Sequence, residues 1–495
     1  MSKKQRCWLL LQLKIKLVKQ LNFNKVVGFA IGPLGVALLG FISVPLLAWM
    51  FSQVDIGRLN ILQMVCSFAM IVFSMGLDQA YIREYHNHKN RPLLFLQCFV
   101  PVLLVLLVIS LLLPYWWESI SNYLFQDGNP YLLLIVLLGV WAILLLRFFS
   151  TILRMQSRGW LFSMSQLINR VVLIAICSFV YFFVENKNFV ILALAFVSGL
   201  VVAALFAAIC VRKDIGASFI AVMKGGDAQD GIALIRFGAP LALAGLCYWA
   251  LTATGTFALN HLSTLQELGA YSVALSFGAA ATVFQQVFTV MWAPAVYKWI
   301  DEGVGQDRFN NIAQDVLSVV VIICCLLGAT IWLIDIVLPD GYSNVKYYVL
   351  CTLLPPMLYT LSEVTAIGIG ISRKTWLNTV ASGIALGVNT LLCWWWVPSL
   401  GACGAVIANT FAFSVYFVAR TEGSCVAWQS QPRFVIYSVV GVLAIAAALT
   451  AWAATLQLKW VFLAWWLLLV PALVLYGKRY KAFFDQMICR LTLVR

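Results

Sequence analysis

Residues 61–86 read ILQMVCSFAMIVFSMGLDQAYIREYH, an apolar run that passes directly into charged residues at Asp78, Arg83 and Glu84. The apolar part has the length and composition of a helix that crosses a bilayer. Charged residues beside such a run mark either the membrane surface or a polar path through the protein. The rest of the chain has to decide between these two settings.

The composition is that of a membrane protein. Of the 495 residues, 63% are hydrophobic and only 11% are charged, whereas soluble domains carry about a quarter of charged residues. Lipid offers backbone groups no hydrogen-bond partner, so the recurring apolar runs have to be helices. The chain is therefore expected to be an all-α integral membrane protein with about 14 transmembrane helices. We expect these helices at residues 26–51, 60–80, 93–114, 131–152, 162–184, 188–211, 234–258, 270–294, 313–336, 347–371, 376–397, 402–419, 434–455 and 459–476.

The positive charge predicts the topology. The net charge is +14, and most Lys and Arg residues lie in alternate connections and in the two terminal tails. The connections predicted on the other side of the membrane contain only four Lys and Arg residues, which are Arg58, Lys187, Lys346 and Lys459. Because Lys and Arg are retained on the cytoplasmic side, both termini are predicted to be cytoplasmic. The charge thus marks topology and gives no reason to expect a nucleic-acid partner.

Short landmarks repeat along the chain in the same order, about 210 residues apart, which indicates a duplication. GPLGVALLG at 32–40 corresponds to APLALAG at 239–245, and Asp55-Ile56-Gly57 corresponds to Glu267-Leu268-Gly269. The duplication predicts two pseudo-symmetric six-helix lobes, related by an axis along the membrane normal. The predicted organisation is a cytoplasmic amphipathic basic tail at 1–25, an N-terminal lobe at 26–211, a cytoplasmic linker at 212–233, a C-terminal lobe at 234–419, and two additional helices with a cytoplasmic tail at 420–495.

Motifs for enzyme chemistry are missing from the sequence. It contains no dinucleotide fingerprint, P-loop, nucleophile elbow or HExxH motif. The 13 cysteines are scattered without metal-binding spacing and are expected to pack as small apolar residues. We therefore expect no catalytic residues, no metal and no cofactor.

Three charged residues lie deep inside the predicted spans, away from the span ends, where each costs about 2.5 to 3.5 kcal/mol. They are Arg147, Arg170 and Glu363, and Arg147 and Glu363 occupy equivalent positions of the repeat. Either they form structural salt bridges or they line a cavity. We interpret Arg147 and Arg170 as ligands of an anionic substrate, and we expect Glu363 to pair with Arg147 as a gate or to couple transport to an ion.

The charged cluster of the first stretch has two interpretations. If the second predicted helix continues inward, Gln79 and Arg83 share one face and Asp78 lies on a neighbouring face. The stripe would then line an inner entrance, with Gln79 and Arg83 binding substrate and Asp78 contributing to coupling. The alternative is a helix end that carries only the topology signal.

Two prolines within spans, Pro33 and Pro240, occupy similar places in the repeated landmarks. Proline interrupts helical hydrogen bonding and can act as a hinge, although it is also an ordinary residue of membrane helices. We assign both prolines as candidate hinges.

The stretch at 31–86, and LDQAYIREY most of all, resembles the beginning of the Wzx-type polysaccharide flippases of the multidrug/oligosaccharidyl-lipid/polysaccharide exporter superfamily. The resemblance implies two lobes around a central cavity that opens alternately to each side of a bacterial inner membrane. The implied cargo is an undecaprenyl-pyrophosphate-linked oligosaccharide for O-antigen or lipopolysaccharide biosynthesis. Membrane lipids, H⁺ or Na⁺ as a coupling ion, and other polysaccharide-assembly proteins are the further partners considered.

Two other functions are compatible with the sequence. One is a drug/cation antiporter of the same superfamily, and the other is a membrane-bound glycosyltransferase. A cation exporter is expected to line its cavity with carboxylates, whereas two arginines face one clearly buried carboxylate here. A glycosyltransferase is expected to carry its acidic catalytic residues on a sizeable extramembrane loop, and the connections of this chain are short.

Overall fold

A computed structural model of the chain describes residues 23–85, 88, 90–129, 131–185, 187–223, 231–301, 306–372, 374–458 and 460–474. Most of the predicted N-terminal tail, the middle of the predicted linker and the predicted C-terminal tail lie outside these residues.

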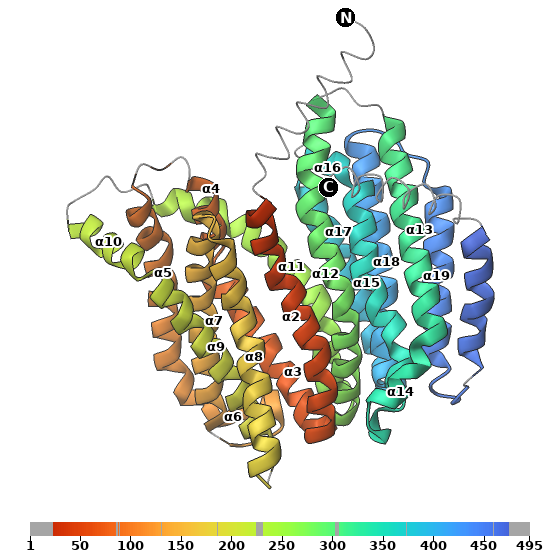
Figure 1. The fold of residues 1–495 in the computed structure, drawn as a ribbon, viewed down its shortest axis with the longest axis horizontal. Helices are drawn as coiled ribbons and strands as arrows, with labels where there is room; N and C mark the ends of the chain where they lie inside the picture. Colours follow the sequence, from red (N-terminus) through yellow and green to blue (C-terminus); the bar gives the residue numbers. More distant parts are fainter. Residues whose placement is uncertain are drawn as a thin grey trace, which may run out of the picture. The chain divides into compact units, whose positions relative to one another are not determined.

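The helices follow one another along the whole described chain (Figure 1). In the first half they are α2 (Phe23–Met50), α3 (Gln53–Ser74), α4 (Leu77–Glu84), α5 (Arg91–Leu112), η1 (Leu113–Trp116), α6 (Trp117–Phe125), α7 (Tyr131–Met155), α8 (Gly159–Phe183), α9 (Phe189–Cys210) and α10 (Arg212–Met223). In the second half they are α11 (Gly231–Leu262), α12 (Leu265–Asp301), α13 (Gln306–Thr330), η2 (Ile331–Leu333), α14 (Ile334–Val337), η3 (Asp340–Tyr342), α15 (Val345–Thr365), α16 (Ile367–Ile371), α17 (Trp376–Leu400), α18 (Ala402–Ala427) and α19 (Phe434–Trp452). A shorter apolar helix, Val461–Val474, comes last.

Every predicted span coincides with one of these helices, which confirms an all-α membrane protein. Within the described residues, eleven helices are long and apolar enough to cross a membrane. Two shorter apolar helices, Leu34–Met50 and Val461–Val474, account for the first and last predicted spans. The remaining span, predicted at 347–371, corresponds to α15 and α16.

Helix α15 is not among the eleven long apolar helices, and protein surrounds it. It packs against α12, α13, α18 and α19, and nearly all of its side chains are buried. Its polar groups find partners there: Thr352 donates a hydrogen bond to the carbonyl oxygen of Ala274 at 2.9 Å, and Thr410 donates one to the carbonyl oxygen of Cys351 at 3.1 Å. A helix enclosed in this way needs no continuous apolar surface toward lipid.

The chain forms two compact units. Unit 1 contains the residues up to 43 together with 62–246, and unit 2 contains residues 44–61 and those from 247 onward. In unit 1, α7, α8 and α9 pack against one another, and α4 and α10 lie at the opposite end of the bundle from α6 (Figure 1). In unit 2, α15 is the central helix. The predicted duplication and its lobe boundaries stay a prediction.

The GPLG sequence of the first landmark lets α2 approach α8 closely. The backbone N–H of Gly32 donates a hydrogen bond to Oγ of Ser163 at 2.9 Å. A Cβ atom added to Gly32 would lie 2.8 Å from the same oxygen, and one added to Gly35 would lie 2.5 Å from a methyl group of Leu167. Small residues at helix contacts bring backbones together in this way in membrane proteins.

Candidate functional site

The charged stretch that contains Asp78, Arg83 and Glu84 does not continue the second transmembrane helix. Helix α3 ends at Ser74, and the backbone adopts left-handed conformations at Met75 (φ 48°) and Gly76 (φ 71°) before α4 begins at Leu77. Gly76 is required at this break, because a Cβ atom there would lie 2.1 Å from the carbonyl oxygen of Gly238. Of the two interpretations left open by the sequence, the one with a continuous inward helix is therefore not what the structure shows.

The break directs Asp78 into the interior of unit 1, where it pairs with Arg147 of α7. Nε and Nη2 of Arg147 both donate to Oδ2 of Asp78, at 3.0 and 2.8 Å. Nε2 of Gln79 donates to the same oxygen at 3.0 Å. The side chain of Asp78 is 6% exposed and that of Arg147 is 38% exposed. One end of the Arg147 guanidinium thus remains accessible.

Gln79 and Arg83 have different surroundings, although they lie four residues apart on α4. Gln79 orients the buried carboxylate of Asp78. Arg83 is exposed, its guanidinium lies 4.0 Å from the ring centroid of Phe237, and its Nε lies 3.5 Å from a carboxylate oxygen of Glu84. Arg83 is therefore a surface cation at the edge of unit 1.

Arg170 is a cation of unit 1 that lies within a membrane span and has no partner among the described residues. It lies in α8, eleven residues after Gly159, and therefore about 16 Å along the helix from its start at 1.5 Å per residue. Its side chain is half-buried, and it makes no hydrogen bond or ion pair in the part of the chain that the structure describes. A guanidinium in a membrane helix without a protein partner has unsatisfied donors for an anion.

In unit 2, Glu363 of α15 pairs with Arg420 of α18. Nη2 of Arg420 donates to Oε1 of Glu363 at 3.1 Å. Its Nη1 donates to Oγ of Ser362 at 2.6 Å, and its Nε donates to Oδ1 of Asn378 at 3.1 Å. The side chains of Arg420 and Glu363 are 9% and 16% exposed. All three nitrogens of this guanidinium are satisfied by the protein.

Aromatic rings enclose this second pair. The guanidinium of Arg420 lies 5.2 Å from the ring centroid of Tyr359 and 5.5 Å from that of Tyr416. Tyr248 packs against both rings, with centroid separations of 5.6 and 6.1 Å. Cation–π contacts of this kind strengthen when the cation is shielded from water. These contacts hold the side chain of Arg420 in place between α15 and α18.

The structure gives both members of the expected gate other partners. We expected Arg147 to pair with Glu363, but Arg147 is bonded to Asp78 and Glu363 to Arg420. Arg420 was missed because the span was expected to end at 419, whereas α18 continues to Ala427. The sequence feature that could have identified Arg420 is its position directly after the apolar run at 402–419.

The hinge assignments remain predictions. Pro240 lies within α11, which runs from Gly231 to Leu262. Pro33 lies within α2, and its side chain is outside the described part of the structure.

No cluster suited to a metal ion is found in the described part of the chain. Nowhere among these residues do three or more His, Cys, Asp or Glu side chains gather in a way that could hold one.

Comparisons with known proteins identify a matching family and several proteins of similar fold. The profile of a family described as polysaccharide biosynthesis protein matches residues 25–299. The fold is similar to that of the lipid II flippase MurJ in an inward closed conformation, with 14% identity, 93% of this chain and 99% of that chain covered, and a TM-score of 0.65. It is also similar to an inward-facing multidrug resistance MATE family transporter of the MOP superfamily, with 14% identity, coverage of 80% and 98%, and a TM-score of 0.56.

A third similar structure is a variant of the Vibrio cholerae MATE transporter VcmN, with 13% identity, coverage of 82% of this chain and 97% of that chain, and a TM-score of 0.52. None of the curated proteins matches the chain in sequence. At these identities the structural likeness establishes the fold, and the resemblance noted at residues 31–86 is confirmed by the family profile.

Proposed function

Since the chain belongs to the polysaccharide biosynthesis protein family, we propose that it is a flippase for an undecaprenyl-pyrophosphate-linked oligosaccharide. It would move this lipid from the cytoplasmic to the periplasmic leaflet of a bacterial inner membrane by alternating access. Both termini would be cytoplasmic, and the product would enter O-antigen or lipopolysaccharide assembly. The protein acts in this proposal as a carrier and not as an enzyme.

The observation that carries the proposal is Arg170, a guanidinium in a membrane helix with no partner in the described structure. An unpaired buried charge is costly unless a ligand compensates it. The diphosphate of the proposed cargo offers several oxygens, and arginine binds such groups through a fork of parallel hydrogen bonds. The sugar hydroxyls need a wet cavity, because each unpaired hydroxyl in hydrocarbon costs about 1 to 3 kcal/mol.

Arg147 is proposed as the second diphosphate ligand. It uses Nε and Nη2 for Asp78, and its Nη1 has no hydrogen bond with any described residue. A phosphate oxygen can therefore bind Nη1 without first breaking the ion pair. Stronger binding would draw Arg147 away from Asp78, which gives two states with different contacts, as a ligand-driven switch requires.

The membrane potential favours outward movement of this cargo. Moving two negative charges out of a negative cytoplasm releases about 4.6 kcal/mol per 100 mV. A coupling ion is not required by this argument. If H⁺ or Na⁺ is coupled, Asp78 is the better candidate than Glu363, because the arginine that holds it is more exposed.

Gln79 and Arg83 take supporting roles in this proposal. Gln79 holds the carboxylate of Asp78, and the exposed Arg83 would attract the anionic cargo to the inner side of the protein. Pro33 and Pro240 would allow α2 and α11 to bend during the transition.

The two alternative functions fit less well. A drug/cation antiporter needs a carboxylate that is available to a cation, whereas the carboxylates Asp78 and Glu363 each accept hydrogen bonds from an arginine. A glycosyltransferase would turn over a sugar donor in detergent, whereas a flippase produces a signal only across a sealed membrane. The purified protein can be assayed in both formats.

The decisive experiment measures lipid-linked oligosaccharide on each leaflet in a strain that lacks the gene. We expect the lipid-linked oligosaccharide to accumulate on the inner leaflet and the wild-type chain to restore its export. Arg170→Ala should restore nothing. Arg170→Lys should restore export in part, because the positive charge contributes more to phosphate binding than the forked N–H groups of the guanidinium. Arg158→Ala is the matched control, since Arg158 is an exposed arginine at the start of the same helix. Normal export by a membrane-inserted Arg170→Ala variant would remove Arg170 from the site.

A further inference from the structure

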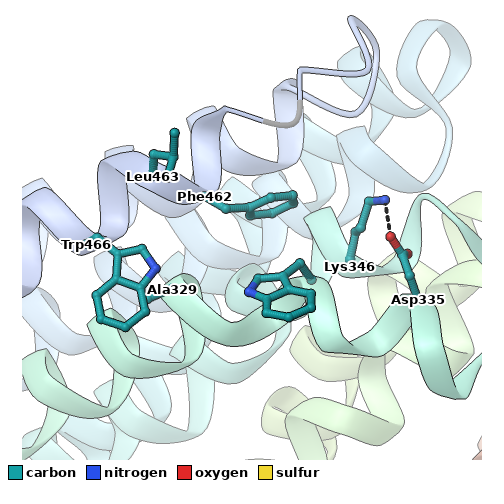
Figure 2. Close-up of a pocket in the computed structure, with 7 residues that line it drawn as sticks. Ala329, Asp335, Lys346, Phe462, Leu463 and Trp466 are labelled. Atoms are coloured by element: carbon teal, nitrogen blue, oxygen red, sulfur yellow. Dashed lines mark hydrogen bonds and ion pairs between the residues drawn. The ribbon is translucent and has the colours of Figure 1, made fainter.

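A groove lies against the last helix of unit 2, and its lining includes neither Arg170 nor any residue of the two arginine–carboxylate pairs described above. Its volume is about 330 Å³. The lining residues come from α13, the η2–α14 connection, α15 and the last helix, and they are Ala329, Trp332, Asp335, Lys346, Phe462, Leu463 and Trp466 (Figure 2). The groove is apolar along most of its length and charged at one end.

An ion pair forms the charged end. Nζ of Lys346 lies 2.5 Å from Oδ2 of Asp335, as the dashed line in Figure 2 shows. The two partners are unequally covered, because the side chain of Lys346 is 7% exposed and that of Asp335 is 43% exposed. Lys346 belongs to the small group of cations that the charge pattern predicts on the outer side of the membrane.

Aromatic side chains form the apolar walls. Trp332 and Trp466 are each about half exposed, at 50% and 49%, and Leu463 is exposed beside them. Neither indole N–H has a hydrogen-bond partner in the described part of the chain. Tryptophan gathers where lipid headgroups meet acyl chains, because its ring is apolar and its N–H needs an acceptor.

We infer that this groove binds a phospholipid of the outer leaflet whose headgroup carries both a phosphate and an amine. Lys346 and the indole N–H groups are donors for phosphate and ester oxygens, and Asp335 is an acceptor for the ammonium group. The apolar walls receive the upper part of an acyl chain. The volume lies within the range of about 300 to 1,000 Å³ that is usual for small-ligand sites.

The charge balance of the groove selects this class of lipid. The Lys346–Asp335 pair is neutral overall, so a headgroup with no net charge leaves no charge uncompensated. A headgroup with the same phosphate but no ammonium group would add a negative charge that nothing compensates beside the half-exposed carboxylate of Asp335, which is unfavourable. The diphosphate of the proposed cargo is disfavoured here for the same reason.

A lipid in the groove would join the last helix to α13 and α15. Phe462 of the last helix stacks on Tyr347 of α15 with a centroid separation of 5.2 Å, and the groove opens beside this contact. The bound lipid would therefore raise the stability of unit 2 by binding the folded state.

Native mass spectrometry of the full-length protein tests the inference, with phosphatidylethanolamine and phosphatidylglycerol of identical acyl chains offered in competition. We expect the wild-type chain to retain phosphatidylethanolamine preferentially. Lys346→Gln should weaken its binding about tenfold, as expected from losing one charge-assisted hydrogen bond. Asp335→Asn keeps an amide oxygen as an acceptor for the buried Lys346, so it should still fold, and it should shift the preference toward phosphatidylglycerol.

Lys187→Gln is the matched control, since Lys187 is also predicted on the outer side but lies over the ring of Tyr181, at 4.6 Å, in unit 1. It should leave lipid binding unchanged. Equal retention of both lipids by the wild-type chain would overturn the inference. So would an Asp335→Asn variant with unchanged preference, since the lipid would then be an ordinary annular one. Neither result bears on Arg170, so failure here is distinguishable from failure of the proposed flippase function.

Discussion

The two arginine–carboxylate pairs of the molecule differ in how completely the protein satisfies the arginine. Arg420 donates through all three nitrogens and lies between two tyrosine rings. Arg147 donates through two nitrogens to a single oxygen of Asp78 and stays more than a third exposed. The difference teaches that a charge inside a membrane span is informative about function only when its partners are known.

The comparison is sharper because Arg147 and Glu363 are equivalent in the predicted repeat. In unit 1 the equivalent position carries the arginine, and in unit 2 it carries the carboxylate. We propose that the pair in unit 2 holds helices together, whereas the pair in unit 1 can exchange its carboxylate for a substrate phosphate.

The largest effect is expected from Arg420→Gln. Removing one partner leaves the buried carboxylate of Glu363 uncompensated, which costs about 3 to 5 kcal/mol. We expect a large fall in the melting temperature of the purified protein and in its amount in membranes. Arg147→Gln should retain more stability, because Gln79 still donates to the carboxylate of Asp78 and Arg147 itself is more than a third exposed, but it should lose transport. Equal destabilisation by the two substitutions would contradict the difference that we propose between the two pairs.

Double-mutant cycles give effects of intermediate size. Arg147→Gln with Asp78→Asn should show a coupling energy of about 0.5 to 3 kcal/mol, because the two side chains share hydrogen bonds. Arg147→Gln with Glu363→Gln should be additive within about 0.5 kcal/mol, because each has another partner. The readout is the free energy of unfolding. Strong coupling between Arg147 and Glu363 would instead restore the gate expected from the repeat.

The smallest effect is expected from Arg83→Gln. Arg83 is exposed, so stability should change by no more than about 0.5 kcal/mol. Flipping in sealed vesicles should slow modestly at low salt and recover at high salt, since screening removes long-range attraction. Arg83→Lys keeps the charge and should behave like the wild-type chain. A salt-independent loss of flipping would place Arg83 in direct contact with the cargo.

The sequence predicts the helices well and their partners poorly. Composition and apolar length identify each span, because lipid imposes one simple rule on every segment that crosses it. The pairing of Asp78 with Arg147 depends on the break at Met75 and Gly76, which the apolar run does not reveal. Gly76 is visible in the sequence, but its contact with Gly238 is a tertiary one.

Arg420 illustrates a second limit of sequence analysis. The apolar run ends before Arg420, so the residue was counted with the cytoplasmic connection, while the helix continues for nearly two turns beyond it. Helix length is set here by packing of α18 against α15 and α17. Hydropathy detects contact with lipid and does not detect a helix that continues inside protein.

The enclosure of α15 has a consequence for how the chain is made. A translocon sorts each emerging segment by its apolarity, and α15 carries Lys346, Glu363 and several hydroxyl groups. The surroundings that satisfy these groups include α18 and α19, which are synthesised later. Insertion of α15 therefore has to be cooperative, with the segment held near the translocon until its neighbours arrive. The helix at the centre of unit 2 is thus expected to enter the membrane together with helices that are synthesised after it.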